Sequence, residues 1–201
     1  MITLDNLMIG YNKAPILDKK LDFCFSDGYV YGVLAPSGKG KSTLLKTISG
    51  LLKPVSGKVT IDGSAYRNTD GNPVFMMHQK YTNFDWLSCL DNILIAQRDK
   101  KLRKDEDARK FLDLVGLSEY ENKYPSMLSG GMQQRLSLAR VLYIKPKYLL
   151  MDEPLSALDD VTRDKMQKLV LDIHRETGNT ILLVTHSKEE ANKMCDEVFY
   201  L

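Results

Sequence analysis

A turn rich in glycine and lysine constrains this chain more than any other feature. Residues 35–43 read APSGKGKST, after the β-rich run YVYGVLA of 29–35 and before a helix pattern over 41–52. Glycines in such a turn let backbone N–H groups converge on one point, and the helix N-terminus adds partial positive charge. This succession of strand, turn and helix predicts a phosphate-binding site.

The side chains of this turn have separate expected tasks. Lys41 is predicted to bridge β- and γ-phosphates, Ser42 to ligate Mg²⁺, and Thr43 to donate to an α-phosphate. The remaining phosphate contacts are expected at Ser37, Gly38, Lys39 and Gly40. The turn departs from the pattern GxxxxGK[ST] at Ala35, where the pattern has glycine, so a negative φ is needed there. A Gly- and Lys-rich surface turn is the alternative that the motif alone leaves open.

Strand and helix patterns alternate at both ends of the chain and predict an α/β fold with a mostly parallel sheet. Strands are expected at 1–11, 21–25, 29–35, 58–62, 73–77, 148–151, 180–184 and 197–201. Helices are expected at 41–52, 88–97, 104–115, 131–143 and 162–176, with a short one starting at 187. The helical middle of the chain predicts a second lobe inserted into the sheet-containing lobe.

Composition excludes several classes of protein. With 201 residues, 43% apolar and 27% charged, the chain fits an ordinary soluble domain rather than a disordered, collagen-like or coiled-coil protein. The formal charge of +2 indicates no electrostatic nucleic-acid surface. Three cysteines without CxxC spacing indicate neither a disulfide framework nor a zinc site, which favours a reducing cytosol. Since no long apolar run or signal sequence is present, we expect the chain not to cross a membrane.

A pair of carboxylates follows a second apolar strand. The run 147–151 leads directly into Asp152, Glu153 and Pro154, at the end of a strand where ligands bind in open α/β sheets. Asp152 is predicted to hold Mg²⁺, and Glu153 to polarise the water that attacks the γ-phosphate. Taken alone, the same residues also fit an apolar strand that ends in a polar turn.

Residues 128–135, LSGGMQQR, resemble the signature sequence of the ATP-binding-cassette (ABC) ATPases. Other positions follow in the order of that family. Tyr11 resembles its adenine-stacking aromatic residue, Gln79 its glutamine loop, residues 156–159 its D-loop, and His186 its switch histidine. The resemblance covers nearly the whole chain.

The resemblance implies a P-loop NTPase fold of the α/β class. Its RecA-like core has a mostly parallel sheet plus an antiparallel β part, with an inserted α-helical subdomain. Residues 1–201 are then one nucleotide-binding domain, with a core lobe of about 1–79 and 146–201 and a helical lobe of about 80–145. Because members of the family often continue past their final strands, an end at Leu201 is expected to mark a minimal or truncated cassette.

The resemblance also implies an active site shared between two copies of the chain. Ser129, Gly130 and Gly131 would grip the γ-phosphate of an ATP bound by the opposite subunit. Two ATP molecules would lie in a homodimer, each between the Lys41 turn of one subunit and the Ser129 turn of the other. The cofactors implied are ATP and Mg²⁺.

Four further residues take their roles from the same resemblance. Gln79 would contact Mg²⁺ and the attacking water, and His186 would contact the γ-phosphate and orient that water. Asp159 would meet the phosphate turn of the opposite subunit. Tyr11 would stack on adenine, although an aromatic residue near a strand end also serves packing alone.

The function implied is that of the ATP-hydrolysing subunit of an ABC transporter, on the cytoplasmic face of the cell membrane. Trp86 and the run CLDNI of 89–93 resemble a segment of the nitrate, sulfonate and taurine importers, with Asp85 where those usually have proline. Trp86 is expected to pack between lobes, to line a groove for a membrane subunit, or to do both. The implied partners are integral membrane permease subunits and an extracytoplasmic substrate-binding protein.

Three alternatives stay open at this point. An ABC-type ATPase acting on nucleic acid or ribosomes usually carries a coiled coil or two cassettes, which this chain lacks. An exporter ATPase shares the same motifs. A P-loop kinase or a non-hydrolysing regulatory module is disfavoured by the signature run and Glu153. The mixed-sign run at 98–110 is expected to be a solvated helix face, so no direct nucleic-acid contact is predicted.

Overall fold

A computed structural model describes residues 1–36, 38–65, 73–80 and 82–201. These residues form two compact units. The first comprises Met1–Met76, Lys147–Glu153 and Gly178–Leu201, and the second comprises Met77–Pro146 and Pro154–Thr177. Each unit is therefore assembled from stretches that are far apart in the sequence.

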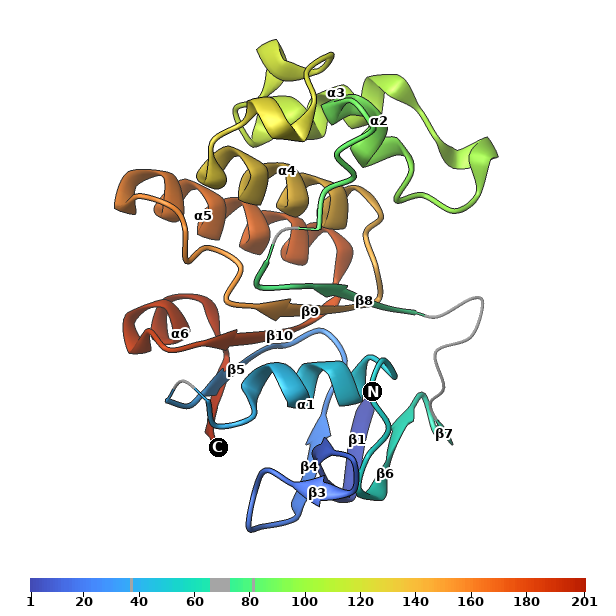
Figure 1. The fold of residues 1–201 in the computed structure, drawn as a ribbon, viewed down its shortest axis with the longest axis vertical. Helices are drawn as coiled ribbons and strands as arrows, with labels where there is room; N and C mark the ends of the chain where they lie inside the picture. Colours follow the sequence, from blue (N-terminus) through green and yellow to red (C-terminus); the bar gives the residue numbers. More distant parts are fainter. Residues whose placement is uncertain (37, 66–72, 81) are drawn as a thin grey trace. The chain divides into compact units, whose positions relative to one another are not determined.

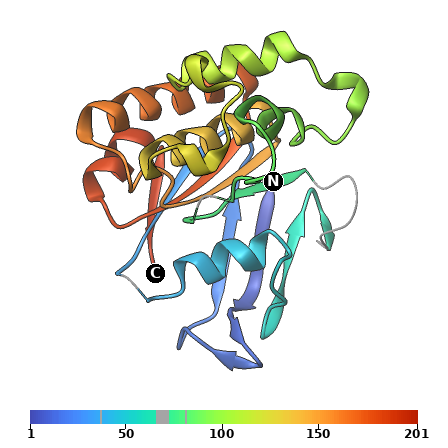
Figure 2. The same ribbon diagram turned by 45° about the horizontal axis from the view of Figure 1, so that its top comes forward.

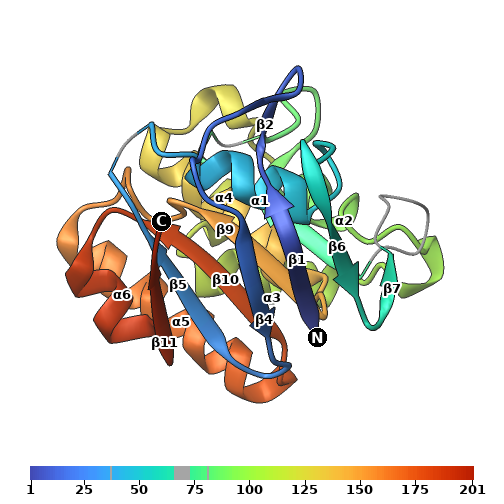
Figure 3. The ribbon, with the colours of Figure 1, turned by 90° about the horizontal axis from the view of Figure 1, so that it is seen from below.

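A five-stranded sheet has the order β11-β5-β10-β9-β8. Its strands are β5 (Val30–Leu34), β8 (Val74–Met77), β9 (Tyr148–Asp152), β10 (Thr180–Thr185) and β11 (Glu197–Tyr200). β10 pairs in parallel with β5 and β9, and β11 pairs in parallel with β5 (Figure 3). Every residue of β5, β9 and β10 is buried, which explains their continuous apolar sequences. The expected mostly parallel sheet is confirmed.

An antiparallel sheet in the first unit has the order β4-β1-β6-β7. Its strands are β1 (Ile2–Met8), β4 (Leu21–Phe25), β6 (Ser56–Ile61) and β7 (Ser64–Ala65). The expected single strand over 1–11 is wrong, because the chain leaves β1 after Met8 and enters a short hairpin. That hairpin pairs β2 (Gly10–Tyr11) with β3 (Ala14–Pro15). Glycine is needed at position 10, because a Cβ atom there would lie only 1.9 Å from the carbonyl oxygen of Ala14.

Helix α1 (Lys41–Ile48) joins the two sheets of the first unit through one apolar core. Leu44, Leu45 and Ile48 pack in this core with residues of β1, β5, β9 and β10. The helix and these strands are labelled in Figure 1. The helix ends four residues earlier than expected, because Gly50 adopts a left-handed φ of 72° that stops it. A second helix of this unit, α6 (Lys188–Met194), contacts β5 and β10.

The second unit is helical, with α4 at its centre. Its helices are α2 (Cys89–Leu94), α3 (Asp105–Leu114), α4 (Gly130–Tyr143) and α5 (Asp160–Thr177), with short 3₁₀ turns η1 (Lys100–Leu102), η2 (Ser118–Tyr120) and η3 (Pro125–Met127). α4 contacts α2, α3 and α5 (Figure 2). Across the described ranges, no helix is both long enough and apolar enough to cross a membrane.

A polar cluster ties the antiparallel sheet to β9. The fully buried Tyr148 at the start of β9 places its hydroxyl 2.6 Å from Oδ1 of Asp62, the residue after β6. Lys147 donates to both carboxylate oxygens of Asp62 at 2.9 Å. These hydrogen bonds, first from Lys147 and then from Tyr148, hold the pKa of Asp62 well below its ordinary value of 3.8.

We predict that Asp62→Asn destabilises the protein by about 1 kcal/mol near neutral pH, as expected for a partly exposed ion pair. Folding lowers the pKa of Asp62, so its stabilisation is complete above 3.8 and is lost as the pH falls below that value. The difference in free energy of unfolding between parent and variant, measured by urea denaturation, should therefore shrink on acidification. Asp18→Asn, at an exposed carboxylate of the same unit, is the control. A difference that grows with falling pH would contradict this account.

Candidate functional site

The ammonium group of Lys41 is buried at the start of α1. Its side chain is 6% exposed, and Nζ donates to the carbonyl oxygens of Ala35 at 2.7 Å and Pro36 at 3.2 Å. Nζ also lies 3.5 Å from Oε1 of Glu153. Ala35 is not among the described residues with positive φ, so its methyl group is tolerated at the first position of the turn.

The first turn of α1 exposes backbone N–H groups. Gly40 precedes the helix with a left-handed φ of 84°, and none of the described side chains caps its N-terminus. The N–H of Leu44 bonds to the carbonyl of Gly40, which leaves the N–H groups of 41–43 to bind an anion. Gly38 and Lys39 lie in the same turn, whereas Ser37 lies outside the described residues.

Tyr11 lies beside the same helix N-terminus. The hydroxyl of the buried Thr43 is 3.4 Å from the hydroxyl of Tyr11, and the Tyr11 side chain remains 46% exposed. Ser42 is half-buried next to Thr43. The hairpin of β2 and β3 therefore brings an accessible aromatic ring to the turn.

Glu153 occupies a strained backbone conformation at the end of β9. Its φ of 46° is unusual for a residue with a side chain and costs about 1–3 kcal/mol. The hydrogen bond from its N–H to the carbonyl oxygen of Val184 in β10, 2.9 Å long, sustains this conformation. The carboxylate is thereby held near Lys41 and also 3.6 Å from Nδ1 of His186.

Lys41, Glu153 and His186 meet although they are far apart in the sequence. Lys41 follows β5, Glu153 follows β9, and His186 follows β10, and these are neighbouring parallel strands. His186 is 62% exposed, whereas Lys41 and Glu153 are largely buried. A cation, a carboxylate and an imidazole thus gather at the carboxyl edge of a parallel sheet, where α/β folds bind ligands.

Ser42 and Asp152 supply oxygen donors in the same unit. Asp152 is the last residue of β9 and is only 3% exposed. Hydroxyl and carboxylate oxygens suit a hard cation such as Mg²⁺. Among the described residues, no group of three or more His, Cys, Asp and Glu could hold a metal ion.

The other predicted site residues belong to the second unit: Gln79, Ser129, Gly130, Gly131 and Asp159. Ser129 caps α4, its hydroxyl accepting the N–H of Met132 at 3.3 Å. Asp159 precedes α5, and the N–H of Thr162 donates to its Oδ1 at 3.0 Å. This backbone hydrogen bond holds the pKa of Asp159 below its ordinary value.

A segment that follows Gln79 in the sequence presents exposed aromatic surface. Trp86 is 73% exposed, and its ring centroid lies 5.3 Å from that of Phe84. Arg140 of α4 stacks over Phe84 at 5.1 Å and donates to the carbonyl oxygen of Thr82 at 2.7 Å. The segment is therefore fixed to α4 while Trp86 stays accessible.

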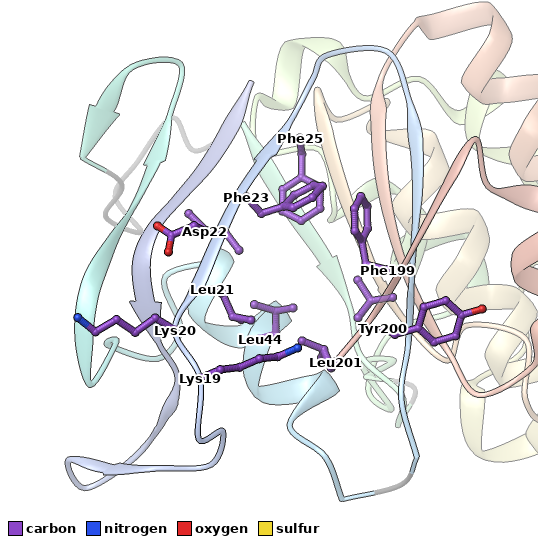
Figure 4. A pocket seen from close by; sticks show the side chains of 12 residues that line it. Lys19, Lys20, Leu21, Asp22, Phe23, Phe25, Leu44, Phe199, Tyr200 and Leu201 are labelled. Carbon is purple, nitrogen blue, oxygen red and sulfur yellow. The ribbon is translucent and has the colours of Figure 1, made fainter.

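A cavity of about 230 Å³ lies elsewhere in the first unit, and none of the predicted site residues lines it. Its walls come from β4, β11 and α1, with Phe23, Phe25 and Phe199 at its apolar side (Figure 4). The candidate site is therefore the strand edge at Lys41 and not this cavity.

Comparison with known proteins identifies the family. The sequence model described as "ABC transporter" matches residues 19–156, which include the Lys41 turn, the signature run and the two carboxylates. The chain belongs to the ABC transporter family. As an ATP-binding protein of this family, the chain binds ATP and hydrolyses it.

Relatives and solved structures agree with this assignment. The taurine import ATP-binding protein TauB of Roseobacter denitrificans is 46% identical to this ABC chain, over 90% of the chain and 68% of that protein. The aliphatic sulfonates import ATP-binding protein SsuB of Zymomonas mobilis is 42% identical, over 100% of the chain and 81% of that protein. A dimeric, post-hydrolysis structure of the ATP-binding cassette MJ0796 with ADP and Pi matches with a TM-score of 0.89 and 29% identity, covering 100% of the chain and 94% of that one. These matches favour a transporter ATPase over the nucleic-acid, kinase and regulatory alternatives.

The sequence patterns of this ABC chain do not reveal three hydrogen bonds, two in the first unit and one in the second. The carbonyls of Ala35 and Pro36 bind Lys41, and no pattern of residue types marks backbone acceptors. Gln134, within the signature run, accepts a hydrogen bond from the N–H of Ala157. No signal in the sequence separates Gln134 from the other polar residues of α4, and only the structure shows that it is buried.

We predict that Lys41→Ala weakens ATP binding to the ABC chain by about 10- to 1,000-fold, because a charge close to the phosphates contributes up to about 4 kcal/mol. Equilibrium titration with a fluorescent ATP analogue measures the change. Lys46→Ala removes the same charge from the last turn of the same helix and should leave the affinity within about twofold. Equal affinities of parent and Lys41→Ala would show that the phosphates bind elsewhere.

Proposed function

We propose that this chain is the ATP-hydrolysing subunit of an importer and drives transport through membrane-embedded partner subunits. The observation that carries the proposal is the gathering of Lys41, Glu153 and His186 at the carboxyl edge of three parallel strands. Two relatives are named as import ATP-binding proteins, one for taurine and one for aliphatic sulfonates, and these names support import as the direction of transport. The whole chain, with its core and helical lobes, would form one nucleotide-binding domain.

ATP would bind with its phosphates at the turn before α1. The backbone of Gly38, Lys39 and Gly40 would surround the phosphates together with Ser37. Lys41 would contact the β- and γ-phosphates, and Thr43 the α-phosphate. Tyr11, exposed beside Thr43, would stack on adenine.

Ser42 and Asp152 would hold Mg²⁺, with Gln79 as a further ligand. The hydroxyl and carboxylate oxygens fit this hard cation, which keeps several water and phosphate ligands of its own. Bound Mg²⁺ supplies neutralisation of the charge that develops on the phosphates. The low exposure of Asp152 keeps its carboxylate in the low-dielectric surroundings where such neutralisation is strong.

Glu153 would accept a proton from the attacking water, and His186 and Gln79 would orient that water. In this structure the carboxylate of Glu153 forms an ion pair with the ammonium group of Lys41. Phosphate oxygens that draw the Lys41 ammonium toward themselves would leave the carboxylate of Glu153 with less positive charge nearby. The carboxylate would then be available to accept a proton from the attacking water once the substrate is bound.

Two copies of the chain would form a homodimer that holds two ATP molecules. Ser129, Gly130 and Gly131 would complete the γ-phosphate site of the opposite copy, and Asp159 would lie against that copy's phosphate turn. The dimeric MJ0796 structure, determined with ADP and Pi, supports this assembly. Hydrolysis would remove the γ-phosphate that both copies contact and so release the interface.

The dimer would act on integral membrane permease subunits at the cytoplasmic face of the cell membrane. The accessible Trp86, fixed to α4 through Phe84 and Arg140, offers an apolar contact for such a subunit. An extracytoplasmic substrate-binding protein would complete the importer. Co-purification of this chain with a membrane protein that carries transport activity would test this assembly.

We predict that Glu153→Gln slows ATP hydrolysis by about 10²- to 10⁴-fold, because glutamine cannot take the proton of the attacking water. ATP should then trap the homodimer, which size-exclusion chromatography with light scattering detects. Glu176→Gln, at an exposed carboxylate near the end of α5, is the matched control and should turn over like the parent. Rapid turnover by Glu153→Gln would overturn the role of this carboxylate.

We predict that Ser129→Arg spares nucleotide binding by the monomer but abolishes dimer formation and hydrolysis. The larger side chain would fill the space in which Ser129 is proposed to meet the opposite copy's phosphate. ATP affinity by titration and dimer mass by light scattering separate the two effects. Ser118→Arg adds the same side chain to an exposed position of the same unit. Normal hydrolysis by Ser129→Arg would contradict the shared active site.

A further inference from the structure

A polar side chain is buried in the signature helix. Gln134 of α4 is only 2% exposed and belongs to the buried, mostly apolar part of that helix. Because a buried amide without partners is costly, such groups are nearly always hydrogen-bonded. The Oε1 atom of Gln134 accepts a hydrogen bond of 2.9 Å from the backbone N–H of Ala157. Ala157 belongs to residues 156–159, the segment that resembles the D-loop.

The D-loop also approaches the first turn of α4 closely. A Cβ atom added to Gly131 would lie 3.4 Å from the carbonyl oxygen of Ala157 and 3.5 Å from Cδ2 of Leu158. The amide of Ala157 thus donates to Gln134, while its carbonyl faces Gly131. Two points of contact, one turn apart on α4, define where the D-loop backbone lies.

The far end of the D-loop is held by α5. Nη2 of Arg163 donates to the carbonyl oxygen of Leu158 at 2.5 Å, and Oδ1 of Asp159 accepts the N–H of Thr162. Within the second unit, the D-loop therefore has one attachment to α4 and another to α5. The attachment to α4 links it to the helix that Ser129 caps.

We propose that Gln134 is a positioning residue that fixes the D-loop to the signature helix, so that Ser129 and Asp159 meet the second copy as one rigid surface. The inference rests on the proposed function, in which both residues contact the opposite subunit. Without the acceptor at position 134, the Ala157 N–H loses its partner and the D-loop gains alternative conformations. Restoring a single conformation when the dimer forms then costs entropy.

This role predicts a specific kinetic signature. The phosphate turn, with Lys41, belongs to the first unit and does not include Gln134. Loss of the Gln134 bond should therefore leave ATP affinity of the monomer unchanged while it lowers kcat and weakens the ATP-dependent dimer. A residue that only packs the helical unit would change thermal stability without this split.

The test compares three variants of the full chain. Gln134→Met keeps the length of the side chain and removes the acceptor, whereas Gln134→Glu keeps an acceptor oxygen. Gln167→Met is the matched control, because Gln167 is 3% exposed in α5 of the same unit and no described residue forms a hydrogen bond with its Oε1. For each, we measure ATP affinity, kcat, the dimer dissociation constant, thermal unfolding, and hydrogen exchange at the amide of Ala157.

We expect Gln134→Met to lower kcat about tenfold, to weaken the dimer by a similar factor and to speed exchange at Ala157, as loss of one buried hydrogen bond implies. ATP affinity should stay within about twofold, and Gln134→Glu should recover most of the dimerisation and kcat. Gln167→Met should keep the parent kcat. An active parent whose kcat is unchanged by Gln134→Met would overturn the positioning role alone, as would an equal loss in Gln167→Met. An inactive parent would instead overturn the proposed function, while hydrogen exchange at Ala157 would still test the attachment of the D-loop.

Discussion

The buried charge of Lys41 is the constraint on which the candidate site depends. An ammonium that is 6% exposed must be paired, and here two backbone carbonyls and the carboxylate of Glu153 surround it. The turn folds back to supply Ala35 and Pro36, while Glu153 reaches the same point from a left-handed backbone conformation. The strain at Glu153 persists because its N–H donates a hydrogen bond to the carbonyl oxygen of Val184 in β10, the buried strand that pairs with β9.

The parallel sheet brings these groups together. β5, β10 and β9 are neighbours, and Lys41, which follows β5, is more than a hundred positions away in the sequence from the residues that follow β9 and β10. Because all three strands are buried along their length, they are held by close packing on both faces, which positions the side chains beyond their carboxyl ends. The geometry of the candidate site in the first unit thus follows from the apolar strands that precede its residues.

The second unit shows a comparable dependence on α4. Ser129 caps this helix, Arg140 holds the segment before α2, and Gln134 holds the D-loop. Segments that the ABC resemblance associates with the partner copy and with the membrane subunits are therefore attached to the same helix.

The sequence by itself determined the local motifs: the glycine turn before α1, the carboxylates after an apolar strand, and the signature run. These motifs indicated the family and the mostly parallel sheet. These depend on neighbouring residues, whose backbone preferences can be read directly. Lys41, Glu153 and His186 could be named from the sequence, and their roles stay predictions. Only the tertiary structure decided that they meet, that the strand expected over 1–11 breaks after Met8, and that Gln134 binds Ala157. Those outcomes come from partners distant in the chain, which local patterns cannot specify.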